Sequence, residues 1–374
     1  MNEELRVIIS GGGTGGHIFP AVSIANAIKE IKSDAKILFV GALGRMEMQR
    51  VPAAGYEIKG LPIQGFDRKN MLVNIKVLFK IWKSQRMAKN IIKEFRPQVA
   101  VGVGGYASGP TLNMAASKGI PCLIQEQNSY AGVTNKLLAK KAAKICVAYE
   151  GMERFFPADK IMLTGNPVRQ QLLETTVSKA DALNAFGLNP QRKTVLIVGG
   201  SLGARTLNES VMLHLDLINK SEVQFIWQTG KYYHAQIMEQ LDKNGKPDNL
   251  TVTDFISDMG AAYKAADIVV SRAGAGSISE FCLLGKPVIL VPSPNVAEDH
   301  QTKNALALVN KNAALYVKDV EAPKLLLPLA IDTVKDDVKL KSLSENILKM
   351  ALPASAEIIA KEVIKLAQQA KNNK

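Results

Sequence analysis

The stretch SRAGAGSISEFCLLGKPVILVPSPNVAEDHQTKNA, residues 271–305, contains the most informative pattern of the chain. It follows the apolar strand Asp267–Val270 and begins with a loop of small residues, after which a helix is expected to open at Ser277. The first turn of a helix has unpaired backbone N–H groups and the positive end of the helix dipole, so this turn can hold a phosphate. Glu280 lies about one turn into that helix, where its carboxylate can accept hydrogen bonds from neighbouring ribose hydroxyls. The alternative is an ordinary strand–loop–helix unit in which Glu280 is solvated.

A second helix is expected close behind the first. The strand Pro287–Val291 leads through a proline-containing turn to the polar run EDHQ, residues 298–301, which opens the next helix. Two successive helix N-termini can therefore face one ligand, one at its phosphate and ribose and the other at a hydroxyl-rich group.

Length and composition set the class of protein. A chain of 374 residues with 47% hydrophobic residues predicts a globular protein of two domains. The three cysteines, Cys122, Cys146 and Cys282, lie in apolar runs without metal-ligand spacing, which indicates reduced core thiols of a cytosolic protein. The N-terminus leads directly into a strand rather than a signal peptide, and no apolar run approaches the roughly 18 residues that span a bilayer.

The net charge of +13 indicates an anionic partner. Nucleic acid, anionic lipid and a phosphorylated substrate would all satisfy that charge. The basic residues are not interleaved with aromatic residues in a groove-binding pattern, so nucleic acid is the least favoured of the three.

A glycine-rich loop near the N-terminus predicts a second phosphate site. The strand Leu5–Ile9 enters SGGGTGGH, residues 10–17, and a helix is expected over Phe19–Lys29. The loop matches a dinucleotide fingerprint, but the next strand, residues 36–40, ends in Gly-Ala-Leu instead of the acid that holds the ribose of NAD, so NAD is discounted. The loop still suits a phosphate. His17 at its mouth can take a proton from a hydroxyl or pair with a phosphate, and the alternative is a histidine that only orders the loop.

A long basic helix is expected over Asn70–Glu94. Its apolar residues fall on one side at helical spacing, and no acidic residue lies between Asn70 and Lys93. The apolar positions are Met71, Ile75, Leu78, Phe79 and Trp82, and the flanking lysines are Lys76, Lys80 and Lys83. The helix either packs its apolar face on the sheet or rests on an anionic membrane surface, and the sequence leaves both interpretations open.

Strands and helices alternate along both halves of the chain, which predicts an α/β protein with parallel sheets. Polar or glycine-rich segments follow strands at Gly102–Pro110 and Gln125–Asn128, at the carboxyl ends where parallel sheets bind ligands. A polar, irregular run after residue 165 separates this half from a second strand–loop–helix series that starts at Lys193. The expected domains are residues 1–164 and 165–352, and a terminal helix, residues 353–374, either packs back on the first domain or completes the second.

Seven motifs occur in order along the chain: GGTGGH (12–17), GVGGYASGP (102–110), QEQN (125–128), TGNPVR (164–169), GGSLGAR (199–205), SRAGAGSISE (271–280) and HQTKNA (300–305). Together they resemble the MurG family, bacterial N-acetylglucosaminyltransferases of glycosyltransferase family 28. The resemblance runs from about Leu5 to Ala314. It implies a GT-B fold, two Rossmann-like domains with parallel sheets facing a central cleft. The implied reaction is the conversion of lipid I to lipid II in peptidoglycan synthesis, by inverting transfer of N-acetylglucosamine from UDP-GlcNAc to the C4 hydroxyl of the muramoyl sugar.

The resemblance also implies site residues, with His17 as the candidate general base. The donor would be bound by Thr14, Gly15, Gly16, Asn128, Arg169, Ser201, Ile256, Gly274, Ala275, Gly276, Ser277, Ile278, Ser279, Glu280 and Gln301. The acceptor would be bound by Gly13, His17, Gly104, Gly105 and Tyr106, and the membrane by Ile75, Lys76, Phe79, Lys80, Trp82 and Lys83. No cofactor or metal is expected, because the chain lacks an Asp-x-Asp metal motif. The implied place of action is the cytoplasmic face of the bacterial cell membrane, with other cell-wall enzymes as further partners.

Two positions depart from the family pattern. His300 stands where a glutamine can occur, and Gln125 stands where a histidine can occur, so contacts around the sugar are left open. The rival interpretations are a UDP-GlcNAc 2-epimerase or a glycosyltransferase for another lipid on the same fold, and a membrane-docked protein that binds a nucleotide sugar without catalysis. The small number of histidines, four, argues against the epimerase.

Overall fold

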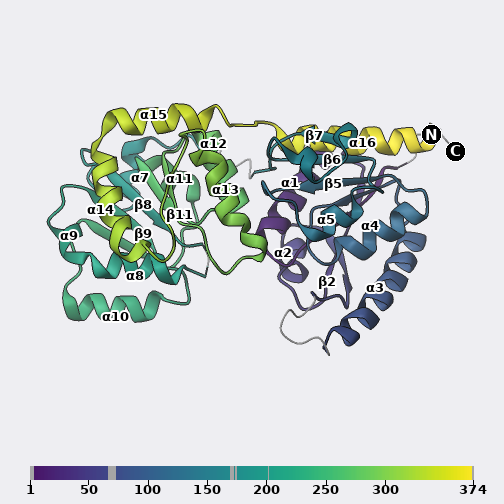
Figure 1. Ribbon diagram of the computed structural model, residues 1–374, viewed down its shortest axis with the longest axis horizontal. Helices are drawn as coiled ribbons and strands as arrows, with labels where there is room; N and C mark the ends of the chain where they lie inside the picture. Colours follow the sequence, from purple (N-terminus) through teal and green to yellow (C-terminus); the bar gives the residue numbers. More distant parts are fainter. Residues whose placement is uncertain (1–3, 66–72, 169–171, 173–174, 201, 373–374) are drawn as a thin grey trace. The chain divides into compact units, whose positions relative to one another are not determined.

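The protein consists of two α/β units, each built around one sheet (Figure 1). The computed structural model describes residues 4–372 apart from 66–72, 169–171, 173–174 and 201. Contacts assign Met1–Val168 together with Leu352–Lys374 to unit 1, and Arg169–Ala351 to unit 2. The α/β class with two parallel sheets that the alternating pattern predicts is therefore confirmed.

Unit 1 has a sheet of seven parallel strands in the order β3-β2-β1-β4-β5-β6-β7. The strands are β1 Arg6–Ser10, β2 Lys36–Ala42, β3 Glu57–Leu61, β4 Val99–Gly102, β5 Cys122–Glu126, β6 Lys144–Val147 and β7 Ile161–Leu163. The helices are α1 Gly15–Ile31, α2 Glu47–Ala53, α3 Val73–Phe95, α4 Ser108–Ser117, α5 Val133–Leu138 and α16 Ser355–Asn372, with short 3-10 turns at Met152–Arg154 and Ala158–Lys160.

The central strands of unit 1 are apolar on both faces because helices cover both sides of the sheet. Alternate residues of a strand point to opposite faces. In β1, Ile8 accordingly belongs to one hydrophobic cluster, whereas Val7 and Ile9 belong to another. The polar side chains of β1 and β5 accordingly lie at the strand ends, where the glycine-rich and polar segments follow.

The C-terminal helix α16 packs along α1, at the other end of the sequence. Its residues Ile359 and Val363 are fully buried in the same cluster as Ile24 and Ile28 of α1. The sequence alone does not determine which unit this helix joins, because its apolar stripe would fit either sheet. In the structure the chain returns from unit 2 at Leu352 and completes the core of unit 1.

Unit 2 has a sheet of six parallel strands in the order β10-β9-β8-β11-β12-β13. The strands are β8 Thr194–Val198, β9 Gln224–Gln228, β10 Leu250–Thr253, β11 Ile268–Ser271, β12 Val288–Leu290 and β13 Leu315–Tyr316. The helices are α7 Lys179–Ala185, α8 Arg205–Leu213, α9 Leu215–Asn219, α10 His234–Asn244, α11 Met259–Ala265, α12 Ala275–Leu284, α13 His300–Val309, α14 Ala322–Lys335 and α15 Asp337–Leu348, with a 3-10 turn at Ala297–Asp299.

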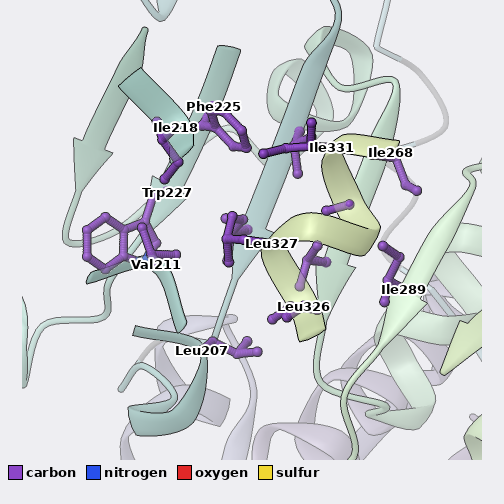
Figure 2. Packing of buried hydrophobic residues seen from close by; sticks show 14 of the residues in the cluster. Leu207, Val211, Ile218, Phe225, Trp227, Ile268, Ile289, Leu326, Leu327 and Ile331 are labelled. Atoms are coloured by element: carbon purple, nitrogen blue, oxygen red, sulfur yellow. The ribbon is translucent and has the colours of Figure 1, made fainter. Parts of the chain in front are cut away.

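The core of unit 2 is centred on Phe225 and Trp227 of β9 (Figure 2). Leu327 and Ile331 of α14 belong to the same buried cluster. The indole N–H of Trp227 donates a 3.0 Å hydrogen bond to Oδ1 of Asn208, so the buried ring leaves no unsatisfied donor. This packing fixes the sheet whose strands lead, at their carboxyl ends, into the predicted binding loops.

Both sheets reverse their strand order at one point, between β1 and β4 in unit 1 and between β8 and β11 in unit 2. In open α/β sheets, ligands bind at the carboxyl ends of the strands next to this switch point. The glycine loops 11–14 and 103–107 follow β1 and β4, and the loops 199–204 and 272–274 follow β8 and β11. The topology therefore brings the predicted binding loops of each unit together in pairs.

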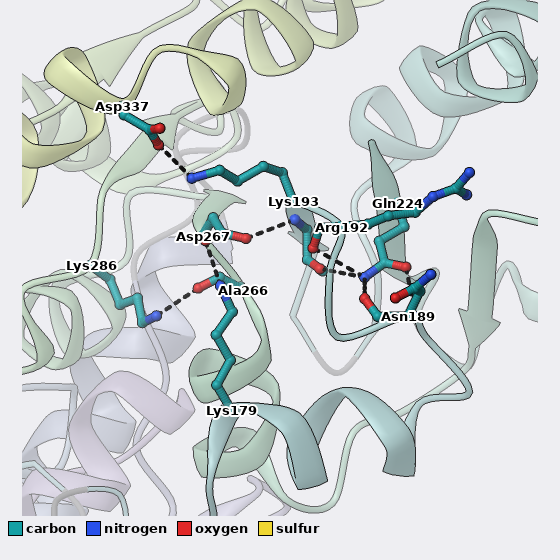
Figure 3. A network of polar contacts seen from close by, with 10 residues as sticks. Lys179, Asn189, Arg192, Lys193, Gln224, Ala266, Asp267, Lys286 and Asp337 are labelled. Atoms are coloured by element: carbon teal, nitrogen blue, oxygen red, sulfur yellow. Dashed lines mark hydrogen bonds and ion pairs between the residues drawn. The ribbon is translucent and has the colours of Figure 1, made fainter. Parts of the chain in front are cut away.

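At the amino ends of its strands, the unit 2 sheet carries a polar network around Asp267 (Figure 3). One carboxylate oxygen of Asp267 accepts from the backbone N–H of Thr194 at 2.8 Å, and the other accepts from Nζ of Lys179 at 2.6 Å. Lys286 donates to the carbonyl oxygen of Ala266 at 2.6 Å, and burial lowers the pKa of Lys286 to about 8. This network links the amino ends of β8, β11 and β12, at the opposite end of the strands from the predicted binding loops.

Candidate active site

The first glycine loop holds His17 on the first turn of α1. The helix begins at Gly15, not at Phe19 as the sequence suggested, because Thr14 takes the extended conformation of a helix cap with φ −143°. The carbonyl oxygen of Thr14 accepts from the backbone N–H groups of His17 and Ile18 at 3.1 and 3.2 Å. His17 is therefore fixed on a helix rather than on a loop, and Gly15 and Gly16 supply first-turn N–H groups for an anion.

The hydrogen bond of His17 determines its neutral tautomer. Nδ1 lies 3.0 Å from the carbonyl oxygen of Gly12 and 3.4 Å from Oγ1 of Thr14. A carbonyl oxygen can only accept, so Nδ1 carries the proton and Nε2 of the neutral ring is the proton acceptor. A general base needs such a nitrogen at the mouth of the site.

The second glycine loop lies directly against the first. Gly104 and Gly105 have φ values of +94° and +83°, which disfavour residues with a Cβ. A Cβ on Gly104 would lie 2.8 Å from Nε2 of His17, and a Cβ on Gly105 would lie 2.4 Å from the carbonyl oxygen of Gly12. The predicted acceptor residues of the two loops are thus neighbours in space, and Tyr106 beside them is 49% exposed.

Glu47, which the sequence analysis did not single out, lies beneath the first glycine loop. Its side chain is only 1% exposed. Oε2 accepts from the backbone N–H of Gly13 at 2.8 Å, and Oε1 accepts from that of Ala42 at 3.0 Å. The N–H of Gly13 therefore points to a carboxylate, so this N–H, at a residue proposed to bind the acceptor, is already engaged. The signal for Glu47 was weak, since one acid in a short helix says nothing about its burial.

Asn128 is held by a second buried carboxylate in unit 1. Glu126 ends β5 and is 2% exposed. Its Oε1 accepts from the backbone N–H and the side-chain amide of Asn128 at 3.0 and 3.3 Å. Its Oε2 accepts from the N–H of Gly132 and the amide of Asn135 at 3.0 and 2.8 Å. Hydrogen bonds to Glu126 thus orient the segment QEQN where β5 ends.

Gln125, one of the two departures from the family pattern, is fully buried. Its amide donates a 2.9 Å hydrogen bond to Oδ1 of Asn166, and the amide of Asn166 donates to the carbonyl oxygen of Gln127 at 3.0 Å. The glutamine at this position therefore joins the turn after β7 to the end of β5.

In unit 2, α12 opens at Ala275, two residues earlier than the sequence suggested. Gly274 is the extended cap residue, and its carbonyl oxygen already accepts from the N–H of Ile278 at 3.0 Å. The side chain of Ile278 is 1% exposed, so this residue serves the core. The first-turn N–H groups that remain for a phosphate are those of Ala275, Gly276 and Ser277.

Ser279 and Glu280 of α12, both predicted to bind the nucleotide-sugar donor, are oriented by hydrogen bonds. Oγ of Ser279 donates to the carbonyl oxygen of Ala275 at 3.0 Å, a bond within the helix. Oε2 of Glu280 accepts from the hydroxyl of Tyr263 at 2.9 Å, and Glu280 is 8% exposed. Glu280 is therefore a largely buried acid with a fixed side chain, which excludes the solvated alternative.

Contacts of Arg272 connect the loop before α12 to later segments of unit 2. The guanidinium of Arg272 donates to the carbonyl oxygen of Val291 at 3.0 Å and pairs with the carboxylate of Asp319. Gln301, a predicted donor residue, accepts from the backbone N–H of Ser293 at 2.8 Å through Oε1. The expected second helix, α13, thus opens at His300 with Gln301 in its first turn.

Ile256, the residue predicted at the nucleotide base, lies after β10. Ile256 is 6% exposed, and its neighbour Phe255 is 47% exposed. The amide of Gln228 donates to the carbonyl oxygens of Gly200 and Asp254 at 3.0 and 3.2 Å, so it links the loop after β8 to the loop after β10. The predicted donor residues Arg169 and Ser201 lie outside the described residues, as do the side chains of Ile75 and Lys76.

Two parallel-sheet units, each with glycine-rich loops and helix N-termini at its switch point, define the GT-B class of glycosyltransferase folds. The glycosyltransferase family 28 N-terminal domain matches residues 7–147, and the glycosyltransferase family 28 C-terminal domain matches residues 194–370. The chain belongs to glycosyltransferase family 28.

Similar proteins extend over the whole chain. A Bacteroides fragilis protein named UDP-N-acetylglucosamine–N-acetylmuramyl-(pentapeptide) pyrophosphoryl-undecaprenol N-acetylglucosamine transferase is 70% identical over 370 residues, 99% of this chain and 97% of its own length. A Phocaeicola vulgatus protein of the same name is 70% identical over 369 residues, 99% of this chain and 98% of its own. The crystal structure of Acinetobacter baumannii MurG has a TM-score of 0.78 at 29% identity, covering 96% of this chain and 99% of that one. The resemblance to the MurG family is confirmed.

Proposed function

We propose that the protein transfers N-acetylglucosamine from UDP-GlcNAc to the C4 hydroxyl of the muramoyl sugar of lipid I, which makes lipid II for peptidoglycan synthesis. The observation that carries this proposal is 70% identity, over 99% of the chain, to a relative named for that transfer. The reaction is a group transfer, so the chain must bind an anionic donor, bind an acceptor hydroxyl and move one proton.

His17 acts as the general base in this proposal. Its Nε2 takes the proton of the C4 hydroxyl as the hydroxyl oxygen attacks C1 of N-acetylglucosamine. The bond between C1 and the diphosphate oxygen breaks at the same time, and UDP leaves with the electron pair, so the configuration at C1 inverts. The hydrogen bond from Nδ1 to Gly12 supports the role, because it places the accepting lone pair on Nε2.

Unit 2 binds the donor. The first-turn N–H groups of α12 hold the diphosphate and stabilise the negative charge that develops on UDP, which is the role a metal plays in other transferases. Glu280 accepts hydrogen bonds from the ribose, Ile256 meets the uracil through its backbone, and Gln301 lies at the sugar. Burial of Glu280 and its bond to Tyr263 support this assignment, because an ordered acceptor loses little entropy on binding.

The face of α3 docks on the membrane that carries the lipid acceptor. Leu78, Phe79 and Trp82 are 58%, 64% and 56% exposed, while the buried residues of the helix include Val77 and Ala88, at 0% and 1%. The described part of the apolar stripe, at Leu78, Phe79 and Trp82, is thus on the outside of unit 1. Arg86, 5.8 Å from the Trp82 ring, and Lys83 flank it with positive charge. Within the part of the chain that the structure describes, no helix is long and apolar enough to cross a membrane.

Turnover with defined substrates tests the proposal. Purified protein is incubated with UDP-GlcNAc and a short-chain lipid I analogue, and UDP release is followed with and without EDTA. We expect release that depends on the acceptor and survives EDTA. Donor binding by calorimetry without acceptor-dependent release would contradict the transfer, and loss of release with EDTA would contradict the metal-independent mechanism.

A further inference from the structure

One peptide group connects Glu47 to His17. The N–H of Gly13 donates to Oε2 of Glu47 at 2.8 Å, and the carbonyl oxygen of Gly12 lies 3.0 Å from Nδ1 of His17. These N–H and C=O groups belong to the same Gly12–Gly13 peptide. Two hydrogen bonds therefore join the three groups: the peptide N–H donates to the carboxylate of Glu47, and Nδ1–H of His17 donates to the peptide C=O.

We propose that Glu47 is a positioning residue that orients and polarises His17 through the Gly12–Gly13 peptide. A carboxylate that accepts from the N–H draws the peptide electrons toward the carbonyl oxygen, which makes that oxygen a stronger acceptor for Nδ1–H. The stronger bond favours the tautomer with Nε2 as proton acceptor and stabilises the imidazolium that forms when Nε2 takes a proton. This role rests on the proposed function of His17 as general base.

The side chain of Glu47 packs closely against two glycines. A Cβ on Gly12 would lie 2.2 Å from Oε1 of Glu47, and a Cβ on Gly41 would lie 2.6 Å from its Cγ. The two glycines therefore leave no room for a Cβ beside the side chain, and a second hydrogen bond, from the N–H of Ala42 at 3.0 Å, orients the other oxygen. A buried charge held in this way acts through a low dielectric, where its effect on neighbouring dipoles is larger than in water.

In the described segments around His17, Glu47 is the acidic or basic side chain that is buried. Residues 11–17, 41–47 and 103–107 contain three other side chains that titrate or carry charge in solution: His17 itself, Arg45 and Tyr106. Arg45 is exposed and Tyr106 is 49% exposed, whereas Glu47 is 1% exposed. Solvent therefore screens the first two from His17 more than it screens Glu47.

Nitrogen NMR of the imidazole tests the inference without substrate. In the wild-type protein we expect the neutral His17 ring to show a protonated Nδ1 and an unprotonated Nε2. In Glu47→Gln, an amide must replace one of two acceptor oxygens, so one N–H loses its partner and the negative charge is gone. We expect the variant to lower the pKa of His17 and to mix the two tautomers. Glu57→Gln, which removes an exposed acid of unit 1, is the matched control and should change neither.

Turnover provides the second readout. We expect Glu47→Gln to lower kcat about 10-fold or more and to move the acidic limb of the pH–rate profile in parallel with the pKa of His17, while KM for UDP-GlcNAc stays within about twofold. A wild-type ring protonated on Nε2 would overturn the inference even if the variant failed to fold. An unchanged ring spectrum in a folded variant would also overturn it. Full turnover of His17→Ala would instead remove the base role from the proposed function and leave the spectroscopic result standing.

Discussion

The hydroxyl of Tyr263 on α11 donates a 2.9 Å hydrogen bond to Oε2 of Glu280 on α12. Both side chains are largely buried, at 4% and 8% exposure, and the Tyr263 ring also stacks edge-on against Phe281 with 5.6 Å between ring centroids. The orientation of the acid proposed to bind the ribose is therefore set by a residue of the neighbouring helix.

Replacing Tyr263 with phenylalanine should weaken nucleotide binding through the ribose alone. The change removes one hydroxyl and keeps the ring packing, so the carboxylate of Glu280 loses a hydrogen bond that contributes about 1 kcal/mol. We expect the Kd of UDP, measured by calorimetry, to rise about 3- to 10-fold. The Kd of 2′-deoxy-UDP should rise less, because part of the ribose contact is already missing. Equal losses for both nucleotides would indicate a general disturbance of unit 2.

Gly104→Ala should lower turnover more than its backbone strain explains. The new Cβ would lie 2.8 Å from Nε2 of His17, so the imidazole must move. We expect kcat to fall about 10-fold or more in a folded protein. Gly119→Ala is the control, since Gly119 also has a positive φ, +71°, but open space around it. If the two variants behaved alike, the proximity of Gly104 to His17 would have no part in catalysis.

Trp82→Glu and Phe79→Glu should reduce binding to anionic liposomes. Each change removes an exposed aromatic ring from α3 and adds negative charge. We expect vesicle affinity, measured by co-sedimentation at low salt, to fall about 10-fold, with turnover of a soluble acceptor analogue unchanged. Tyr232→Glu, at a 79% exposed position of unit 2, controls for added charge. If the wild-type protein did not bind anionic vesicles at low salt, the proposed membrane contact of α3 would be wrong.

Lys286 should make the stability of unit 2 rise with pH above about 8. Burial lowers the pKa of Lys286 to about 8, below the ordinary value of 10.5, so between these pH values the unfolded chain binds more protons than the folded one. Stability then rises with pH, by up to about 1 kcal/mol per pH unit. We expect Lys286→Met to lose this rise in urea unfolding followed by Trp227 fluorescence, with Trp82→Phe in both proteins. Parallel pH profiles would show that Lys286 is not the cause.

The three cysteines should resist thiol reagents in the folded protein. Cys122, Cys146 and Cys282 are buried, and burial raises the pKa of each thiol to about 12. The reactive species is the thiolate, which is scarce at neutral pH for such groups. We expect Ellman's reagent to modify all three in denaturant and none rapidly without it. Fast labelling of one thiol in native protein would reveal local opening around it.

The fold class was predictable because its signals are local and repeated. Apolar strands ending in glycine-rich turns alternate with helices, and parallel sheets follow from that alternation. Helix starts were predicted less well. Gly15 and Ala275 open α1 and α12 earlier than expected, since helix-start preferences favour polar caps and place little weight on glycine and alanine.

The supporting residues of the site were not predictable in the same way. Nothing in the sequence around Glu47 or Tyr263 distinguishes them from other helical residues. Their roles come from hydrogen bonds to residues that folding brings beside them. The outward face of α3 shows a related limit. Its stripe at Leu78 and Trp82 has the same spacing as a core-facing stripe, and only the structure shows that Val77 and Ala88 are the buried positions instead.

The packing of α16 on α1 has a consequence for the order in which the protein can fold during synthesis. Unit 2 is one continuous stretch, Arg169–Ala351, so all of its residues are synthesised before α16. The hydrophobic surface of α1 that α16 covers, including Ile24 and Ile28, stays exposed until the last residues emerge. The first part of the chain to be translated is thus the last to complete its core, and a nascent chain that stalls before Ser355 presents an unfinished, apolar N-terminal unit.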